Sequence, residues 1–200
     1  MSNRNILWKE IVNLTLAILY IRRKKTRIMI NVLLLFVGLF LNSNPPKDVY
    51  GFSFKTLDGK EVKLSKFKGK KILIVNTASK CGYTKQYEDL EKLHKQYGKD
   101  VVLIGFPSAN FGGQELGTNA EIKEFCSSKF ATTFLIAEKS DVKGADITPL
   151  FQFLTSAPNP DFTGDIKWNF EKFLINEKGQ LVHRYRSAVT PLDQQIVKNL

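Results

Sequence analysis

One cysteine lies where an apolar strand is expected to turn into a helix. Residues 71–78 contain the continuous apolar run Ile72–Val75, which is typical of a strand covered on both faces. Apolar residues recur at helical spacing over residues 84–97, so a helix is expected there. Cys81 falls between the two, where free backbone N–H groups and the positive end of the helix dipole favour thiolate over thiol, and Lys80 adds positive charge. Cys81 is therefore predicted to be a reactive nucleophile.

Cys126 is the only other cysteine in the chain. Two thiols 45 residues apart do not form a disulfide scaffold, and no Cys/His group has the spacing of a zinc site. Ile122 and Phe125 have the spacing of an apolar helix face, so Cys126 can be a core residue of the same helix. The residues alone leave open whether Cys126 is structural or takes part in chemistry.

Three separated segments resemble signatures of the glutathione peroxidase family. They are Asn76–Thr84 (NTASKCGYT), Phe106–Glu115 (FPSANFGGQE) and Trp168–Phe173 (WNFEKF), in the family's order. The resemblance runs from about Val49 to Leu200. It implies an antioxidant peroxidase with a redox-active cysteine that reduces hydrogen peroxide and organic or lipid hydroperoxides through a cysteine sulfenic acid. Thioredoxin or glutathione would be the reductant.

The resemblance also implies hydrogen-bond donors around the nucleophile. Carboxamide and indole N–H groups can stabilise the negative charge on the departing oxygen without titrating themselves. Trp168 and Asn169 match two of the family's donor positions by identity. The family's glutamine is expected at Asn110, which keeps the amide but is one methylene shorter, with Gln114 as an alternative donor. The catalytic residues implied are thus Cys81, Asn110, Trp168 and Asn169.

In the two-cysteine members of the family a second cysteine resolves the sulfenic acid. Cys126 matches that position, so the resemblance implies that it condenses with Cys81 and that a thioredoxin-type dithiol reduces the resulting disulfide. Glutathione is less favoured as the reductant, because the chain shows no dedicated glutathione-recognition cluster. No metal, flavin or nucleotide cofactor is implied. The long insertion before Trp168 that is typical of tetrameric members is absent, which favours a monomer.

The positive charge is concentrated at the N-terminus. Of the formal net charge of +11, residues 1–47 carry +7 and the remaining residues carry +4. The C-terminal part therefore has an ordinary charge balance, and nucleic-acid binding is not expected.

Residues 1–44 are expected to form a signal or membrane-anchor segment, and residues 45–200 the peroxidase domain. A basic cluster at 22–27 precedes the apolar stretch 28–41, which is the pattern of a secretory signal. This stretch is shorter than the roughly 20 residues of a full span, but no clear cleavage site follows, so an uncleaved anchor is an alternative. Translation could also begin at Met29. We expect an exported, periplasmic or membrane-anchored protein, with a cytoplasmic location as the alternative.

The remaining elements are expected to support the cysteine and the donors. The pattern indicates a hairpin around Asp58-Gly59, further strands and helices in alternation, a closing hairpin and a last helix capped by Thr190-Pro191. The expected ranges are strands at 49–55, 60–64, 101–106, 132–137, 173–176 and 180–185, and helices at 118–129 and 147–156. This order predicts an α/β, thioredoxin-like fold with an N-terminal hairpin and a mixed central sheet that has helices on both faces.

Three other functions fit a fold of this class. A thiol-disulfide oxidoreductase would usually show Cys-x-x-Cys, and here Thr84 occupies the fourth position. A copper-delivery module would need a second cysteine and a histidine near Cys81, and both are missing there. A membrane-tethered peroxide sensor that uses the Cys81–Cys126 pair remains open, because sensing and catalysis share their first step.

Overall fold

A five-stranded sheet forms the centre of residues 46–200 in the computed structural model, which describes these residues and the exposed helical residues 22–25. The strand order is β5-β4-β3-β6-β7. Strand β3 pairs in parallel with β4 and antiparallel with β6, so the sheet is mixed. The strands are β3 (Lys71–Thr77), β4 (Val101–Pro107), β5 (Leu135–Ile136), β6 (Lys172–Ile175) and β7 (Leu181–Tyr185).

The register of β3 brings three loops to one edge of the sheet. Thr77 at the end of β3 pairs with Pro107 at the end of β4, so the segments that follow both strands leave at the same edge. Because β6 is antiparallel to β3, its first residue Lys172 pairs with Val75 near that same edge. The loop after Thr77, the loop after Pro107 and the segment before Lys172 therefore converge.

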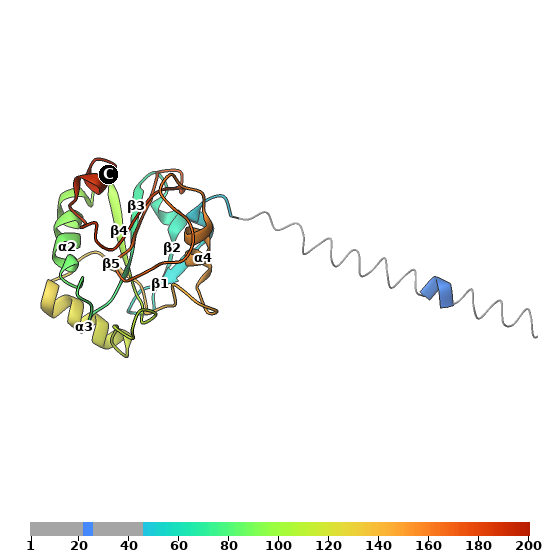
Figure 1. Ribbon diagram of the computed structural model, residues 1–200, viewed down its shortest axis with the longest axis horizontal. Helices are drawn as coiled ribbons and strands as arrows, with labels where there is room; N and C mark the ends of the chain where they lie inside the picture. Colours follow the sequence, from blue (N-terminus) through green and yellow to red (C-terminus); the bar gives the residue numbers. More distant parts are fainter. Residues whose placement is uncertain (1–21, 26–45) are drawn as a thin grey trace, which may run out of the picture. The chain divides into compact units, whose positions relative to one another are not determined.

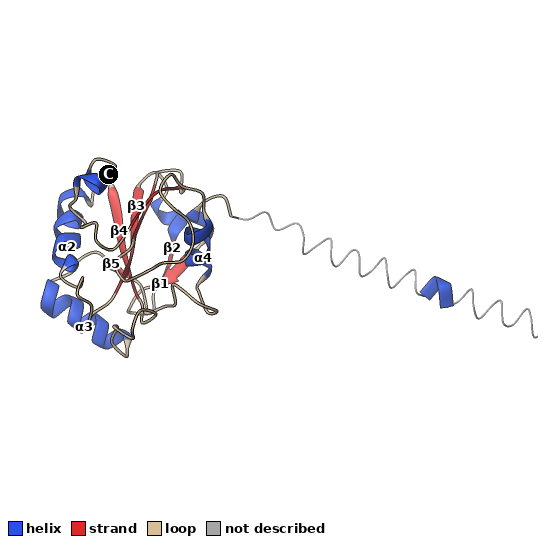
Figure 2. Cartoon of the chain, viewed as in Figure 1, coloured by secondary structure: helices blue, strands red, loops and turns tan. Residues whose placement is uncertain are grey.

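Helices cover both faces of the sheet, as the sequence predicts (Figures 1 and 2). Helices α2 (Gln86–Tyr97) and α3 (Asn119–Phe130) lie on one face. Helix α4 (Pro149–Ser156) and the N-terminal hairpin of β1 (Ser53–Lys55) and β2 (Glu61–Lys63) lie on the other. Side chains of β3 alternate between the two cores, with Leu73 and Val75 in the α2 core and Ile72 and Ile74 in the α4 core.

The predicted element boundaries are mostly close to those of the structure. The capping box that opens α3 is present, with Thr118 and Glu121 bonding each other's backbone. Helix α2 begins at Gln86 rather than at Thr84. The predicted cap of the last helix is wrong, because α5 (Gln194–Val197) is capped by Asp193, whose carboxylate accepts the Gln195 N–H at 2.8 Å. Two short 3-10 helices, Val49–Gly51 and Leu64–Phe67, complete the elements of residues 46–200.

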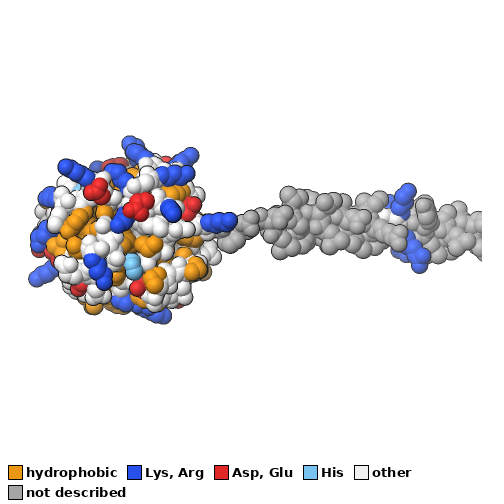
Figure 3. Space-filling view, turned by 90° about the horizontal axis from the view of Figure 1, so that it is seen from above, with side chains coloured by type: hydrophobic (Ala, Val, Ile, Leu, Met, Phe, Trp, Pro, Cys, Tyr) orange, Lys and Arg blue, Asp and Glu red, His pale blue; other side chains and the backbone are white. Residues whose placement is uncertain are grey.

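The predicted anchor at 28–41 lies outside the described residues. Within residues 22–25 and 46–200, no helix has the length and apolar character needed to cross a bilayer. On the face shown in Figure 3, the lysine and arginine side chains of residues 46–200 are dispersed, with acidic side chains between several of them. The division of the chain at residues 44–45 stays a prediction.

A buried lysine fastens the C-terminal segment to the start of α2. The Lys172 ammonium donates to the Gln86 amide oxygen at 2.5 Å and to the Ser187 carbonyl at 3.3 Å, and it also contacts the Val189 carbonyl. Burial lowers the pKa of Lys172 to about 7, with Glu171 acting in the opposite direction. In the unfolded chain a lysine has a pKa of about 10.4. Between these two pKa values, Lys172 is therefore more often protonated in the unfolded state than in the folded state.

Lys172 is therefore expected to make the protein more stable as pH rises from neutrality. The sign follows from linkage, since stability rises with pH wherever the unfolded state holds more protons, here by up to about 1.4 kcal/mol per pH unit. The Lys172→Met variant is expected to lose this slope. Urea unfolding at pH 7.5 and pH 9 gives the change in unfolding free energy with pH for each protein. Subtracting the change found for the variant from that of the wild type removes the contributions of other titrating groups. Equal slopes would contradict the prediction.

Candidate active site

The turn between β3 and α2 holds Cys81 through Thr84. The Thr84 hydroxyl accepts a hydrogen bond from the Cys81 N–H at 2.9 Å and donates one to the Ala78 carbonyl at 2.8 Å. The Cys81 sulfur accepts a hydrogen bond from the Tyr83 N–H at 3.4 Å. Cys81 is 8% exposed, so the turn holds the sulfur beside a donor and leaves a small part of the residue accessible.

The buried carboxylate of Glu115 supports the start of the same turn. Its Oε1 atom accepts hydrogen bonds from the N–H groups of Ser79 at 3.2 Å and Leu116 at 2.7 Å. Burial raises the pKa of Glu115, although the hydrogen bonds from Ser79 and Leu116 and the charge of Lys139 act in the opposite direction. The Glu115 side chain therefore holds the backbone of Ser79 and Leu116 at the start of the Cys81 turn.

A second turn presents Trp168 and Asn169 just before β6. Phe170 has a φ of +65°, an uncommon conformation for a residue with a Cβ atom. Asn76 of β3 holds this turn on both sides of Asn169. Its amide Nδ2 donates to the Trp168 carbonyl at 3.1 Å, its Oδ1 accepts the Glu171 N–H at 2.9 Å, and its carbonyl accepts the Phe170 N–H at 2.6 Å. The strand that leads to Cys81 therefore also positions the Trp168–Asn169 turn.

Gln114 connects the two turns. Its backbone carbonyl accepts the N–H of Lys80, the residue before Cys81, at 2.9 Å. Its side-chain Oε1 accepts a hydrogen bond from the Asn169 amide at 3.1 Å. Asn169 is fully buried, and its own Oδ1 accepts no hydrogen bond from any described residue. Since its oxygen is already bonded to Asn169, the NH₂ group of Gln114 remains available as a donor at the site.

Asn110 has its side chain engaged elsewhere. Its Nδ2 donates to the Asp141 carboxylate at 2.6 Å. Its Oδ1 accepts from the Val142 N–H at 2.7 Å and from the Ser108 hydroxyl at 2.8 Å. Within residues 46–200, no hydrogen bond joins Asn110 to the Cys81 turn or to the Trp168–Asn169 turn. The structure thus links the Cys81 turn to the Asn169 amide through Gln114, and it uses the Asn110 amide to hold the loop at Asp141. The catalytic roles of these residues stay predictions.

Cys126 lies in α3 and is buried, with 1% exposure. Burial raises the pKa of its thiol to about 11, Glu115 adds to the effect, and the Tyr87 hydroxyl beside it acts in the opposite direction. Both cysteines are free thiols in this structure. Cys126 also lines a cavity of about 330 Å³, near Asp58 and Lys123. In this state Cys126 is a neutral, enclosed thiol, and its resolving role stays a prediction.

Some residues of the site were not singled out from the sequence. Asn76 and Thr84 hold the two turns, and neither was predicted to have a role. A signal exists for Asn76, because a polar residue directly after a buried apolar run must find hydrogen-bond partners inside the protein. Thr84 gave no comparable signal, because a hydroxyl in a turn is common.

Comparison with known proteins identifies the same region of the chain. Residues 49–155 match the family described as "Glutathione peroxidase". The chain is 48% identical over 150 residues to the "Glutathione peroxidase-like peroxiredoxin GPX5" of Chlamydomonas reinhardtii, covering 74% of this chain and 91% of that protein. It is 46% identical over 150 residues to the "Hydroperoxy fatty acid reductase gpx1" of Synechocystis sp., covering 72% and 89%.

Solved structures give the same result for the fold. The crystal structure of T. cruzi GPX1 is similar with a TM-score of 0.60 and 33% identity, covering 76% of this chain and 93% of that one. A thioredoxin-family thiol:disulfide interchange protein from Chlorobium tepidum has a TM-score of 0.58 at 18% identity, covering 79% and 97%, and it shows the fold alone. The predicted thioredoxin-like fold is confirmed. With its motifs, its fold and these relatives, the chain belongs to the glutathione peroxidase family.

Proposed function

We propose that this thiol-dependent peroxidase reduces hydroperoxides through Cys81. The thiolate attacks the terminal oxygen of the peroxide, the O–O bond breaks, and Cys81 becomes a sulfenic acid. The departing oxygen takes up a proton and leaves as water or an alcohol. The observation that carries the proposal is the position of the Cys81 sulfur, which lies beside the Tyr83 N–H in a turn bonded through Gln114 to the buried amide of Asn169.

Three side chains are proposed to stabilise the charge on the departing oxygen. Trp168 supplies an indole N–H, Asn169 an amide, and Gln114 the second amide. The bond between Gln114 and Asn169 favours Gln114 over Asn110 as that donor, because the Asn110 amide is bonded to Asp141. Neutral donors suit this role, since they keep the same charge at every working pH.

Two alanine variants separate these candidates. Gln114→Ala is expected to slow the oxidation of Cys81 by hydrogen peroxide by about a hundredfold to a thousandfold, the range found when one donor to a developing oxyanion is removed. Asn110→Ala is expected to leave that rate close to the wild-type rate and to lower thermal stability, because it releases the loop at Asp141. Stopped-flow measurement of Cys81 oxidation checks both. A larger loss for Asn110→Ala than for Gln114→Ala would restore Asn110 as the donor.

We propose that Cys126 resolves the sulfenic acid and that thioredoxin or a similar dithiol reduces the disulfide, with glutathione as the alternative. Formation of the Cys81–Cys126 bond releases the sulfenic oxygen as water. The naming of one relative as a peroxiredoxin supports a protein-thiol reductant.

The proposed substrates are hydrogen peroxide and organic or lipid hydroperoxides. One relative is named for reducing hydroperoxy fatty acids. Tyr83 and Trp168 are exposed large apolar side chains, at 37% and 40%, and both belong to the turns that form the site. An apolar substrate would find contact area there.

The remaining proposals concern the whole chain. Export or membrane attachment through residues 28–41 rests on the basic and apolar pattern of that segment, with a cytoplasmic location as the alternative. A monomer is proposed because the chain lacks the insertion typical of tetrameric relatives. Cell fractionation and size-exclusion chromatography of the full-length protein would decide both.

Steady-state turnover tests the proposed function. The full-length protein is supplied with hydrogen peroxide, thioredoxin, thioredoxin reductase and NADPH, and glutathione with its reductase replaces them in a parallel assay. A peroxidase is expected to consume many equivalents of peroxide in one of the two assays. Consumption that stops after one equivalent in both would indicate a sensor, a reading that the enzymatic names of the relatives do not favour.

A further inference from the structure

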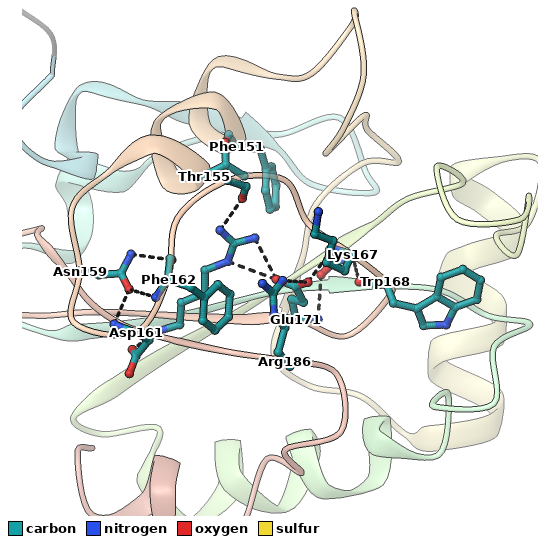
Figure 4. A network of polar contacts seen from close by, with 12 residues as sticks. Phe151, Thr155, Asn159, Asp161, Phe162, Lys167, Trp168, Glu171 and Arg186 are labelled. Carbon is teal, nitrogen blue, oxygen red and sulfur yellow. Dashed lines mark hydrogen bonds and ion pairs between the residues drawn. The ribbon is translucent and has the colours of Figure 1, made fainter.

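The Trp168 indole is only partly packed against the protein. Trp168 is 40% exposed, and among the described residues its ring packs against one other ring, that of Phe111, at a centroid distance of 5.9 Å. In Figure 4 the indole projects away from the polar cluster behind it. Its position therefore depends in large part on the backbone of the turn that carries it.

Glu171 holds that backbone directly. Its Oε1 atom accepts a hydrogen bond from the N–H of Lys167, the residue before Trp168, at 2.6 Å. Glu171 is fully buried, and its backbone N–H is bonded to Asn76. One residue thus joins the turn at its beginning through its side chain and at its end through its main chain.

Two arginines of the C-terminal segment fix the Glu171 carboxylate (Figure 4). Arg184 donates to Oε2 through Nε at 3.1 Å and through Nη2 at 2.9 Å, and its side chain is fully buried. Arg186 donates to Oε1 at 2.7 Å, and its side chain is 40% exposed. Together with Lys167, four N–H groups converge on one carboxylate, so its hydrogen-bonding capacity is filled and its orientation is fixed.

The arginines are themselves fixed by the segment before the turn. Arg184 donates to the Gly164 carbonyl at 2.6 Å, and its backbone N–H donates to the Asp161 carboxylate at 2.8 Å. The guanidinium groups of Arg184 and Arg186 lie 4.8 Å and 3.7 Å from the centre of the Phe162 ring. Strand β7, residues 161–164 and the Trp168 turn are therefore joined at a single buried carboxylate.

We propose that Glu171 is a positioning residue for peroxide reduction, which fixes the Lys167 backbone and thereby places Trp168 and Asn169 opposite the Cys81 turn. The inference rests on the proposed function of Cys81. A positioned donor is useful only within a narrow range, since a displacement of about 1 Å can cost on the order of a hundredfold in rate. The Cys81 turn is held by Thr84 and Tyr83, and within residues 46–200 no hydrogen bond joins Glu171 to either of them.

The Glu171→Gln variant separates these two effects. The rate at which hydrogen peroxide oxidises Cys81 is expected to fall by about tenfold to a hundredfold. The rate at which iodoacetamide alkylates Cys81, followed on its peptide by mass spectrometry, is expected to stay unchanged, because alkylation needs only the thiolate. In a Trp8→Phe background, acrylamide is expected to quench Trp168 fluorescence more strongly when Gln replaces Glu171.

Two further variants keep the test decisive. Glu91→Gln is the matched control, because Glu91 is also a buried carboxylate, bonded to Thr133 on the α2 side, and all three readouts should stay at wild-type values. Glu171→Gln leaves buried Arg184 without its counter-ion and is expected to be less stable. Arg186→Gln keeps the Arg184–Glu171 pair, and it is expected to fold and to show a smaller fall in the same oxidation rate.

The outcomes distinguish failure of the positioning role of Glu171 from failure of the proposed function of Cys81. If the wild-type protein reacts with peroxide and both Glu171→Gln and Arg186→Gln match it, the positioning role is overturned. If Glu171→Gln does not fold, wild-type oxidation by Arg186→Gln alone overturns it. Equal losses in oxidation and alkylation also overturn it, since they would mean that the whole site had loosened. A wild-type Cys81 that does not react with peroxide would overturn the proposed function, and this inference with it.

Discussion

Replacement of Cys81 by serine is expected to reduce hydroperoxide consumption to the uncatalysed background. A serine hydroxyl is not ionised near neutral pH and cannot form a sulfenic acid, so neither the attack on the peroxide nor the later disulfide is available. The measurement is consumption of hydrogen peroxide and of a fatty-acid hydroperoxide, with thioredoxin or glutathione and the matching reductase. Residual turnover well above background would show that another group reduces the peroxide, and the role of Cys81 would be wrong.

The fold of this variant is expected to be unchanged. Serine is close in size to cysteine, and the Thr84 hydroxyl bonds the backbone of residue 81 rather than its side chain. Circular dichroism and the thermal midpoint of Cys81→Ser should therefore match those of the wild-type protein. A large drop in the midpoint would mean that the loss of activity reflects unfolding, and Cys81→Ala would then be the variant to measure.

Replacement of Cys126 by serine is expected to stop turnover with thioredoxin after the first equivalent of peroxide. The first oxidation of Cys81 should keep its wild-type rate, since Cys126 is enclosed in α3 and makes no hydrogen bond to the Cys81 turn within residues 46–200. Mass spectrometry is expected to show a Cys81–Cys126 disulfide in the oxidised wild-type protein and a trapped Cys81 sulfenic acid in the variant. Normal turnover of the variant with thioredoxin would contradict the resolving role.

For this second reaction we expect α3 to open, because Cys126 is buried within it. At a pKa of about 11, roughly one Cys126 thiol in ten thousand is ionised at pH 7. A disulfide also needs Cα atoms within about 7 Å of each other. Helix α3 buries only Ile122 and Cys126 of its 12 residues, and Phe130 near its end stacks on Tyr87 at 5.2 Å. A helix with so few buried contacts can unwind locally at low cost, which would expose and ionise Cys126.

The fold could be predicted from the sequence because its strongest signals are local. The apolar run of β3, the Asp58-Gly59 turn and the Thr118–Glu121 capping box each specify one element, and each is present in the structure. The last helix was placed wrongly because Thr190-Pro191 and Asp193 both resemble a helix start, and the choice between them depends on how the chain end packs. The local sequence offers two helix-start signals of equal strength, so it does not decide between them.

The site could be predicted only in part. Cys81, Trp168 and Asn169 stand in motifs, whereas the choice between Asn110 and Gln114 depends on the path of the loop between them. Gly112 and Gly113 both have positive φ, at 66° and 63°, and they turn the chain so that the two amides point to different partners. Such a path is decided by long-range contacts, here with Asp141 and Asn169, which no local pattern reveals.

Strand β3 positions both the Cys81 turn and the turn that carries the proposed donors. The same strand leads into the Cys81 turn and, through hydrogen bonds of Asn76, holds the turn that carries Trp168. Any tilt or slide of β3 against the rest of the sheet therefore carries both turns along in the same direction. The distance between the Cys81 sulfur and the proposed donors is therefore expected to change little when the whole strand moves. A small shift confined to one of the two turns should reduce reactivity more than such a motion of the strand.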